Sequence, residues 1–202
     1  TRIRAAVPTL QLLLERDARA ISVCSHLGRP KTDEDRARLS LAPVERRLRE
    51  LLPDERLTVL ENTRFDPRET KNDEGLAREL AEGMELYVND AFGSAHRAHA
   101  STEAVAHVLP AYAGLLLLAE LDHLGRLLED VERPFVLVAG GAKVEDKLGV
   151  LRHLGGRADT VVVGGKMAEE LRDGSPLGVV TDGGEDLARH LYAIVNSPRA
   201  MG

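Results

Sequence analysis

Short apolar runs alternate with segments of helical periodicity along most of this chain. The runs, rich in Val, Ile and Leu, lie at residues 20–24, 57–60, 86–88, 135–139 and 160–163. Their continuous apolar character indicates strands buried on both faces, which is typical of parallel sheets with helices on each side. The alternation therefore predicts an α/β fold: a doubly wound, Rossmann-like parallel sheet in a three-layer αβα arrangement, followed by a second, incomplete α/β domain.

The predicted helices have apolar residues at the three- and four-residue spacing of one helix face. The opening segment shows this spacing with Ile3, Val7, Leu10 and Leu14. A Ser-Thr-Glu run from Ser101 predicts a capped helix start at that point. The predicted helices cover residues 3–16, 39–52, 73–82, 115–129 and 144–154, and two more begin at residues 101 and 167.

Composition excludes several classes of protein. With 43% hydrophobic and 30% charged residues, the 202-residue chain can form a packed core. A net charge of -6 and an aromatic content of 3% argue against nucleic-acid binding, which favours a basic surplus and stacking rings. The longest apolar run, residues 115–119, is far shorter than the roughly 20 residues that span a bilayer. We therefore expect no nucleic-acid or membrane partner, and we expect a monomer.

The single cysteine, Cys24, ends the first apolar run. One cysteine cannot form a disulfide within its own chain, which favours a reducing compartment and a cytoplasmic location. A buried, unreactive thiol is the expected role of such a residue, and a reactive thiol is the alternative.

Basic side chains follow three consecutive predicted strands. The first loop carries His26 and Arg29, the second carries Arg64 and the third carries Arg97. Ligands of open parallel sheets bind at the carboxyl ends of the strands, where these loops meet. The planar guanidinium group matches carboxylate and phosphate oxygens two at a time. The loops therefore predict a pocket for a small, multiply charged anion.

Two other interpretations of these loops remain open. Each basic residue could be a solvated surface charge. Alternatively, His26, His96 and His99 could hold a metal ion, although the neighbouring cations disfavour one.

The fourth and fifth strand ends carry glycine turns with lysine. Gly140 and Gly141 precede a helix start that presents Lys143 and Lys147, four residues apart and so on one face. Free N–H groups at a helix start attract phosphate, so this turn predicts a phosphate site. It matches neither the Walker pattern nor the dinucleotide fingerprint. The fifth end, with Gly165, is either a nucleotide contact or a plain tight turn.

Four of these loops together resemble those of phosphoglycerate kinase. They are Ser-His-Leu-Gly-Arg-Pro at 25–30, Glu-Asn-Thr-Arg-Phe at 61–65, Asp-Ala-Phe-Gly-Ser-Ala-His-Arg-Ala-His at 90–99 and Gly-Gly-Ala-Lys-Val-Glu-Asp-Lys at 140–147. They occur in the family's order, and the resemblance extends from about residue 1 to about residue 177. The chain is identified from them as a fragment of a member of this family.

The resemblance implies a glycolytic and gluconeogenic kinase. Members of the family move a phosphoryl group reversibly between 1,3-bisphosphoglycerate and ADP, giving 3-phosphoglycerate and ATP, with Mg²⁺ on the nucleotide. Such an enzyme is a phosphotransferase with a carboxyl group as acceptor. Both leaving groups, a carboxylate and a diphosphate, are stable as anions, so positioning and charge stabilisation suffice without a general base.

The resemblance also implies roles for individual residues. The 3-phosphoglycerate contacts would be Arg2, His26, Arg29, Arg64 and Arg97. The nucleotide contacts would be Gly141, Ala142, Lys143, Lys147 and Gly165. Arg2 and Lys143 would be catalytic, because they would stabilise charge on the phosphoryl group in transfer.

The implied domain organisation has four parts. Residues 1–114 would form a glycerate-binding domain that lacks its first strand, and residues 115–130 a connector helix between domains that close by hinge bending. Residues 131–177 would start the nucleotide-binding domain. Residues 178–202 match nothing in the family and would form a divergent tail.

The sequence also departs from the family pattern. The family's first strand and its Asp-x-Asn loop are absent, and Lys166 stands where glycine is common. We therefore expect this chain alone to be a poor kinase. One alternative is a truncated, non-catalytic remnant that binds a phosphorylated small acid. A nicotinamide-dependent dehydrogenase is disfavoured, because its fingerprint is missing.

Overall fold

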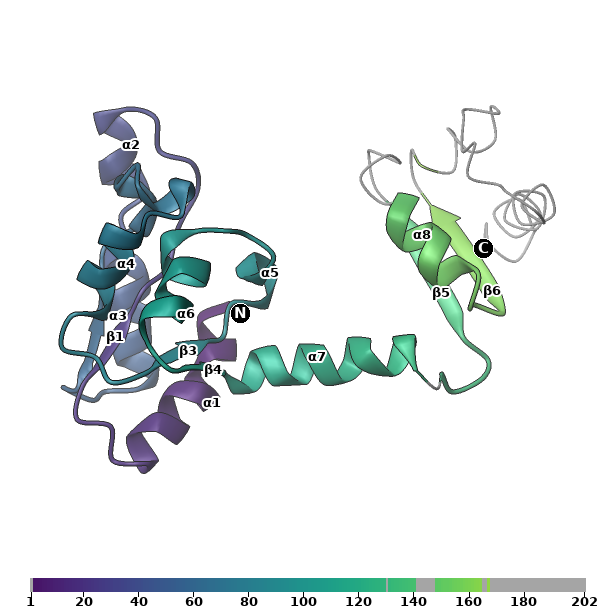
Figure 1. The fold of residues 1–202 in the computed structure, drawn as a ribbon, viewed down its shortest axis with the longest axis horizontal. Helices are drawn as coiled ribbons and strands as arrows, with labels where there is room; N and C mark the ends of the chain where they lie inside the picture. Colours follow the sequence, from purple (N-terminus) through teal and green to yellow (C-terminus); the bar gives the residue numbers. More distant parts are fainter. Residues whose placement is uncertain (1, 130, 141–147, 165–166, 168–202) are drawn as a thin grey trace. The chain divides into compact units, whose positions relative to one another are not determined.

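The computed structural model describes residues 2–129, 131–140, 148–164 and 167, and the chain divides into two compact units, Thr1–Asp122 and His123–Gly202 (Figure 1). Helix α7 contributes residues to both. The four-part division predicted from the sequence stays a prediction.

The first unit alternates helices and short strands, as expected. Its helices are α1 (Arg2–Glu15), α2 (Asp33–Arg38), α3 (Ala42–Leu51), α4 (Glu74–Ala81), α5 (Phe92–Ala95), α6 (Val105–Val108) and the start of α7 (Leu115–Leu128). Its shorter turns are the 3-10 helices η1 (Thr63–Phe65) and η2 (Glu69–Lys71) and the π-helical turn η3 (Ala100–Ala104). Its strands are β1 (Ile21–Val23), β2 (Leu57–Val59), β3 (Tyr87–Asn89) and β4 (Ala111–Ala113). No helix in the described part of the chain is long and apolar enough to cross a membrane.

Parallel pairing confirms the predicted α/β class. Strand β1 pairs with β2 in the register Ile21–Leu57, and β3 pairs with β4 in the register Tyr87–Ala111. In the second unit, β5 (Val136–Gly140) pairs with β6 (Thr160–Gly164). Within the described ranges the strands form three two-stranded sheets. Parallel strands point their carboxyl ends the same way, so the loops after β1 and β2 emerge at one edge.

Helices α1 and α3 cover the β1–β2 sheet. The apolar stripe of α1 packs Leu10 and Leu14 against Leu48 of α3 and Leu57 of β2, and all four are buried. Burying such side chains contributes roughly 1.5–3 kcal/mol each, so this cluster holds the sheet that carries two of the basic loops. A second cluster joins α4 to η3 and α6 through Ala77, Ala81, Ala104 and Val105.

Several local predictions for the first unit were wrong or incomplete. Helices α2 and α5 and strand β4 were not anticipated, because all three are short and lack an apolar stripe. The start of α2 has a recognisable signal, since Thr32 and Asp35 form a capping box. Ser101 is no helix cap: the π-helical turn begins at Ala100, and the Ser101 hydroxyl donates to Glu69 instead.

The second unit packs β5 and β6 with helix α8 (Leu148–Gly155). Its buried cluster consists of Leu151, Val161, Val163 and Met167. Strand β6 buries Val161 and Val163, but Val162 is only partly buried, and β5 is not buried on both faces either: Val138 is 73% exposed. A continuous apolar run does not show which face of the strand is covered, because that depends on segments far away in the sequence.

Cys24 directly follows β1, and its surroundings raise its pKa from 9.0 to about 11, chiefly through burial and also through the charge of Glu69. Only the thiolate reacts, so raising the pKa of Cys24 from 9.0 to about 11 reduces the thiolate population about 100-fold at pH values below 9. We therefore expect iodoacetamide at pH 8 to alkylate the folded chain about 100 times more slowly than the urea-unfolded chain. Equal rates in the two states would contradict an unreactive, partly buried thiol.

A cationic pocket at the strand ends

A pocket of about 920 Å³ opens in the first unit where the loops after the strands converge. Six arginine or lysine side chains line it against two aspartates, Asp33 and Asp66, and His99 lines it as well. The six cationic residues are Arg29, Lys31, Arg36, Arg64, Lys71 and Arg97. Such a surplus of cations in a concave site favours a multiply charged anion.

Three of the predicted anion-binding residues meet in this pocket. Arg29 comes from the loop after β1, Arg64 from η1 after β2, and Arg97 from the segment after α5. Their convergence agrees with the expectation drawn from strand-end loops. Neither Arg29 nor Arg97 forms a salt bridge with a residue that the structure describes.

The remaining predicted residues lie elsewhere. His26 is partly buried beside the pocket, where burial and then the charges of Arg64 and Arg97 lower its pKa. Arg2 is exposed in the first turn of α1 and is not among the described pocket residues. The predicted nucleotide contacts lie outside the described residues: Gly141, Ala142, Lys143, Lys147 and Gly165, together with Lys166.

Arg64 is the most firmly placed of the cations. Its Nη1 donates to the carbonyl oxygen of Gly28 at 2.7 Å, which ties the second loop to the first. Asn62, only 2% exposed, caps η1 and donates from Nδ2 to the carbonyl oxygens of Leu27 (2.8 Å) and Leu39 (2.9 Å). Gly28 has a positive φ of 62°, a conformation that residues with a Cβ rarely adopt.

The electrostatics around Arg64 show crowding of like charge. Burial first, then Arg97 and Arg29, lower its pKa, while Glu69 opposes them. Its Nε is buried and has no hydrogen-bond partner among the described residues. A buried donor without a partner costs about 1–3 kcal/mol, so an anion that accepted from this nitrogen would be bound more tightly.

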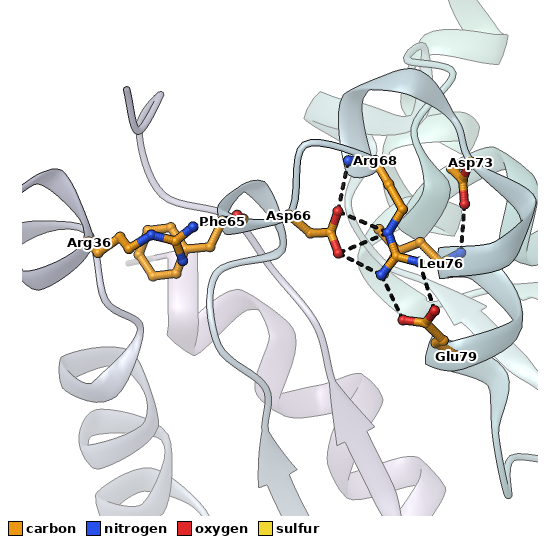
Figure 2. A network of polar contacts seen from close by, with 7 residues as sticks. All are labelled: Arg36, Phe65, Asp66, Arg68, Asp73, Leu76 and Glu79. Carbon is orange, nitrogen blue, oxygen red and sulfur yellow. Dashed lines mark hydrogen bonds and ion pairs between the residues drawn. The ribbon is translucent and has the colours of Figure 1, made fainter. Parts of the chain in front are cut away.

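The pocket also has cations that sequence reasoning did not single out. Arg36 of α2 lies over the Phe65 ring, 5.0 Å from its centre, and its Nη2 donates to the Phe65 carbonyl oxygen at 3.0 Å (Figure 2). By contrast, Arg68 is held by both Asp66 and Glu79 (Figure 2). Two carboxylates at 2.7 Å therefore compensate the charge of Arg68. Besides its cation–π contact, Arg36 has one more distant carboxylate partner, Oδ1 of Asp33 at 3.7 Å.

The alternative metal site is not supported. Histidines 96 and 99 do not converge with His26 on a cluster: among the described residues, no group of three His, Cys, Asp or Glu could hold a metal ion. His96 is exposed, and burial lowers the pKa of His99, which faces the pocket.

Comparison with known proteins decides the family. The sequence model described as "Phosphoglycerate kinase" matches residues 1–57 and 52–179. This chain belongs to the phosphoglycerate kinase family. A phosphoglycerate kinase from Roseiflexus sp. (strain RS-1) is 52% identical over 192 residues, covering 83% of this chain and 48% of the relative. One from Rubrobacter xylanophilus is 50% identical over 200 residues, covering 89% and 50%.

Solved structures agree with that membership. Phosphoglycerate kinase from Coxiella burnetii has a TM-score of 0.74 and 34% identity, covering 96% of this chain and 55% of that one. The Pyrococcus horikoshii OT3 enzyme has a TM-score of 0.73 and 27% identity, covering 98% and 57%. The chain thus spans about half the length of the phosphoglycerate kinases that it matches.

Proposed function

We propose that the pocket binds 3-phosphoglycerate and that the chain is part of an enzyme moving a phosphoryl group between 1,3-bisphosphoglycerate and ADP. The observation that carries the proposal is the convergence of Arg29, Arg64 and Arg97 in one pocket of a family member. A phosphate and a carboxylate on a three-carbon acid would engage these guanidinium groups by charge-assisted, paired hydrogen bonds.

The chemistry that this pocket can support is positioning. Its cations would hold the substrate's phosphate away from the reacting carboxylate and orient that carboxylate toward the nucleotide. Arg2 and Lys143 would then stabilise the negative charge that spreads over the phosphoryl oxygens in transfer. Magnesium would enter with the nucleotide as its counter-ion, and Gly141, Ala142, Lys147 and Gly165 would contact that nucleotide.

Transfer to ADP rather than to water requires the reacting groups to be enclosed. We therefore propose closure of the glycerate and nucleotide parts of the enzyme about the helix that connects them. A cytoplasmic monomer remains our expectation for the enzyme.

Separate calorimetric titrations of the 202-residue chain with 3-phosphoglycerate and with MgADP test the proposal. We expect saturable binding of 3-phosphoglycerate with one site per chain. Binding of MgADP as well would favour the kinase, whereas 3-phosphoglycerate binding alone would favour the non-catalytic remnant. No binding of 3-phosphoglycerate would contradict both.

A further inference from the structure

Glu69 is a fully buried carboxylate beneath the cationic pocket. It is 0% exposed and starts η2, the turn that also carries the pocket residue Lys71. A buried carboxylate is costly unless its oxygens accept hydrogen bonds, so its partners show what holds it there.

The partners of Glu69 come from the segments that carry two of the pocket's arginines, Arg64 and Arg97. Oε1 accepts from the hydroxyl of Thr63 at 3.2 Å and from the hydroxyl of Ser101 at 2.6 Å. Oε2 accepts from the Ser101 backbone N–H at 3.0 Å. Thr63 directly precedes Arg64, and Ser101 follows His99 by two residues. One side chain therefore joins η1 to the segment that carries Arg97 and His99.

Glu69 also faces His99, whose Nδ1 lies 3.6 Å from Oε1. Burial lowers the pKa of His99, so this contact is an ion pair only when the imidazole is protonated. Within the described residues, no arginine or lysine forms a salt bridge with Glu69. Glu69 therefore does not neutralise the pocket's arginines and lysines through a salt bridge among the described residues, while its carboxylate fixes the backbone segments that present Arg64 and Arg97.

We propose that Glu69 is a positioning residue, whose buried carboxylate clamps the Arg64 and Arg97 loops together and keeps the pocket's guanidinium groups converged before the substrate arrives. Preorganisation of this kind raises affinity by removing the cost of ordering the loops on binding. The inference rests on the proposed function for the identity of the anion.

Two substitutions separate the clamp from the charge. Glu69→Ala removes all three hydrogen bonds, and we expect it to weaken 3-phosphoglycerate binding about tenfold or more. Glu69→Gln can rebuild them: its oxygen can accept from the Ser101 N–H, while its amide N–H groups donate to the two hydroxyls. We expect Glu69→Gln to bind within about threefold of wild type.

The titration of His99, followed by NMR without any ligand, gives a readout that a general loss of stability would not move. Burial lowers the pKa of His99; the charge of Glu69 opposes that shift, and the charges of Arg64, Arg97 and His96 add to it. We expect the pKa of His99 to fall in Glu69→Gln. Glu85→Ala is the matched control, because Glu85 is an exposed carboxylate paired with Arg19. It should change neither the affinity nor the titration.

The outcomes are distinct. If wild type does not bind 3-phosphoglycerate, the proposed function fails. An unchanged His99 titration in Glu69→Gln would overturn the placement of the Glu69 carboxylate against His99, on which the clamp is argued. If wild type binds and Glu69→Ala binds equally well, only the clamp fails. Should Glu69→Ala not fold, Ser101→Ala removes one bond of the clamp and should weaken binding about threefold. Unchanged affinity in that variant would overturn the inference.

Discussion

Arg64→Ala is expected to weaken 3-phosphoglycerate binding about 100-fold, because it removes charge-assisted hydrogen bonds worth roughly 1.5–3 kcal/mol in a partly enclosed site. Arg64 is held by the Gly28 carbonyl at 2.7 Å, so little conformational entropy opposes its contact with an anion. Its buried Nε also lacks a partner among the described residues, and a bound carboxylate or phosphate could supply one. Isothermal titration calorimetry at constant ionic strength measures the change.

Two further variants make this result specific. Arg64→Lys keeps the charge but loses the planar fork, so we expect an intermediate loss of about tenfold. Arg49→Ala removes an equal charge from an exposed position of α3, where Arg49 pairs with Glu45, and should leave affinity unchanged. If Arg64→Ala binds as tightly as Arg49→Ala, Arg64 is not a substrate contact.

Gly114→Ala is expected to destabilise the first unit by about 3 kcal/mol, because the new methyl group would collide with a helix cap. A Cβ at residue 114 would lie 2.3 Å from Oδ1 of Asp90. That oxygen accepts from the N–H groups of Leu116 (2.8 Å) and Leu117 (3.2 Å) at the start of α7. Asp90 would have to leave the helix start, which would orphan those donors.

Thr9 ties the same cap to α1. Its hydroxyl donates to Oδ2 of Asp90 at 2.8 Å and accepts from the Leu115 N–H at 3.0 Å, and Thr9 is buried. The start of α7 is thereby bonded to the end of β3 and to α1, so moving Asp90 would disturb three elements. This explains why the expected loss exceeds the roughly 1 kcal/mol of an ordinary cap.

A double-mutant cycle tests the mechanism. Asp90→Ala alone should cost about 2 kcal/mol, and adding Gly114→Ala should cost little more, since the collision partner is gone. Urea unfolding followed through amide resonances of residues 2–122 gives the free energies. Gly125→Ala is the matched control in α7: nothing lies within 4 Å of its new methyl group. It should be neutral or stabilising by up to about 1 kcal/mol. Additive losses for the Asp90 and Gly114 changes would contradict the account.

The meeting of Arg29 and Arg64 could be predicted because it depends on local signals: apolar runs predict parallel strands, and the loops after the paired strands β1 and β2 share an edge of their sheet. Arg97 follows β3, which within the described ranges pairs with β4 in another sheet, so strand pairing alone does not explain its place in the pocket. Arg36 could not be anticipated in the same way, since its position depends on α2, a six-residue helix without buried residues, and on Phe65 from another loop.

Glu69 shows the other limit of sequence reasoning. A single glutamate between an arginine and a threonine has no pattern that predicts burial, and its partner Ser101 lies 32 residues away. The Ser-Thr-Glu run at Ser101 has the composition of a helix start, but the hydroxyl bonds to Glu69 instead. A hydrogen bond between residues 32 positions apart explains both the burial of Glu69 and the conformation at Ser101, and neither hydrophobic periodicity nor capping rules predict such a bond.

The most direct measurement is an NMR titration of the 202-residue chain with 3-phosphoglycerate, observing the Nε–Hε resonances of its arginines. We predict that Arg29, Arg64 and Arg97 shift together along one saturation curve, with smaller shifts at His26 and His99, while exposed Arg49 on α3 does not move. Shifts confined to other arginines, or shifts at these three that never saturate, would contradict the claim that this pocket binds the glycerate.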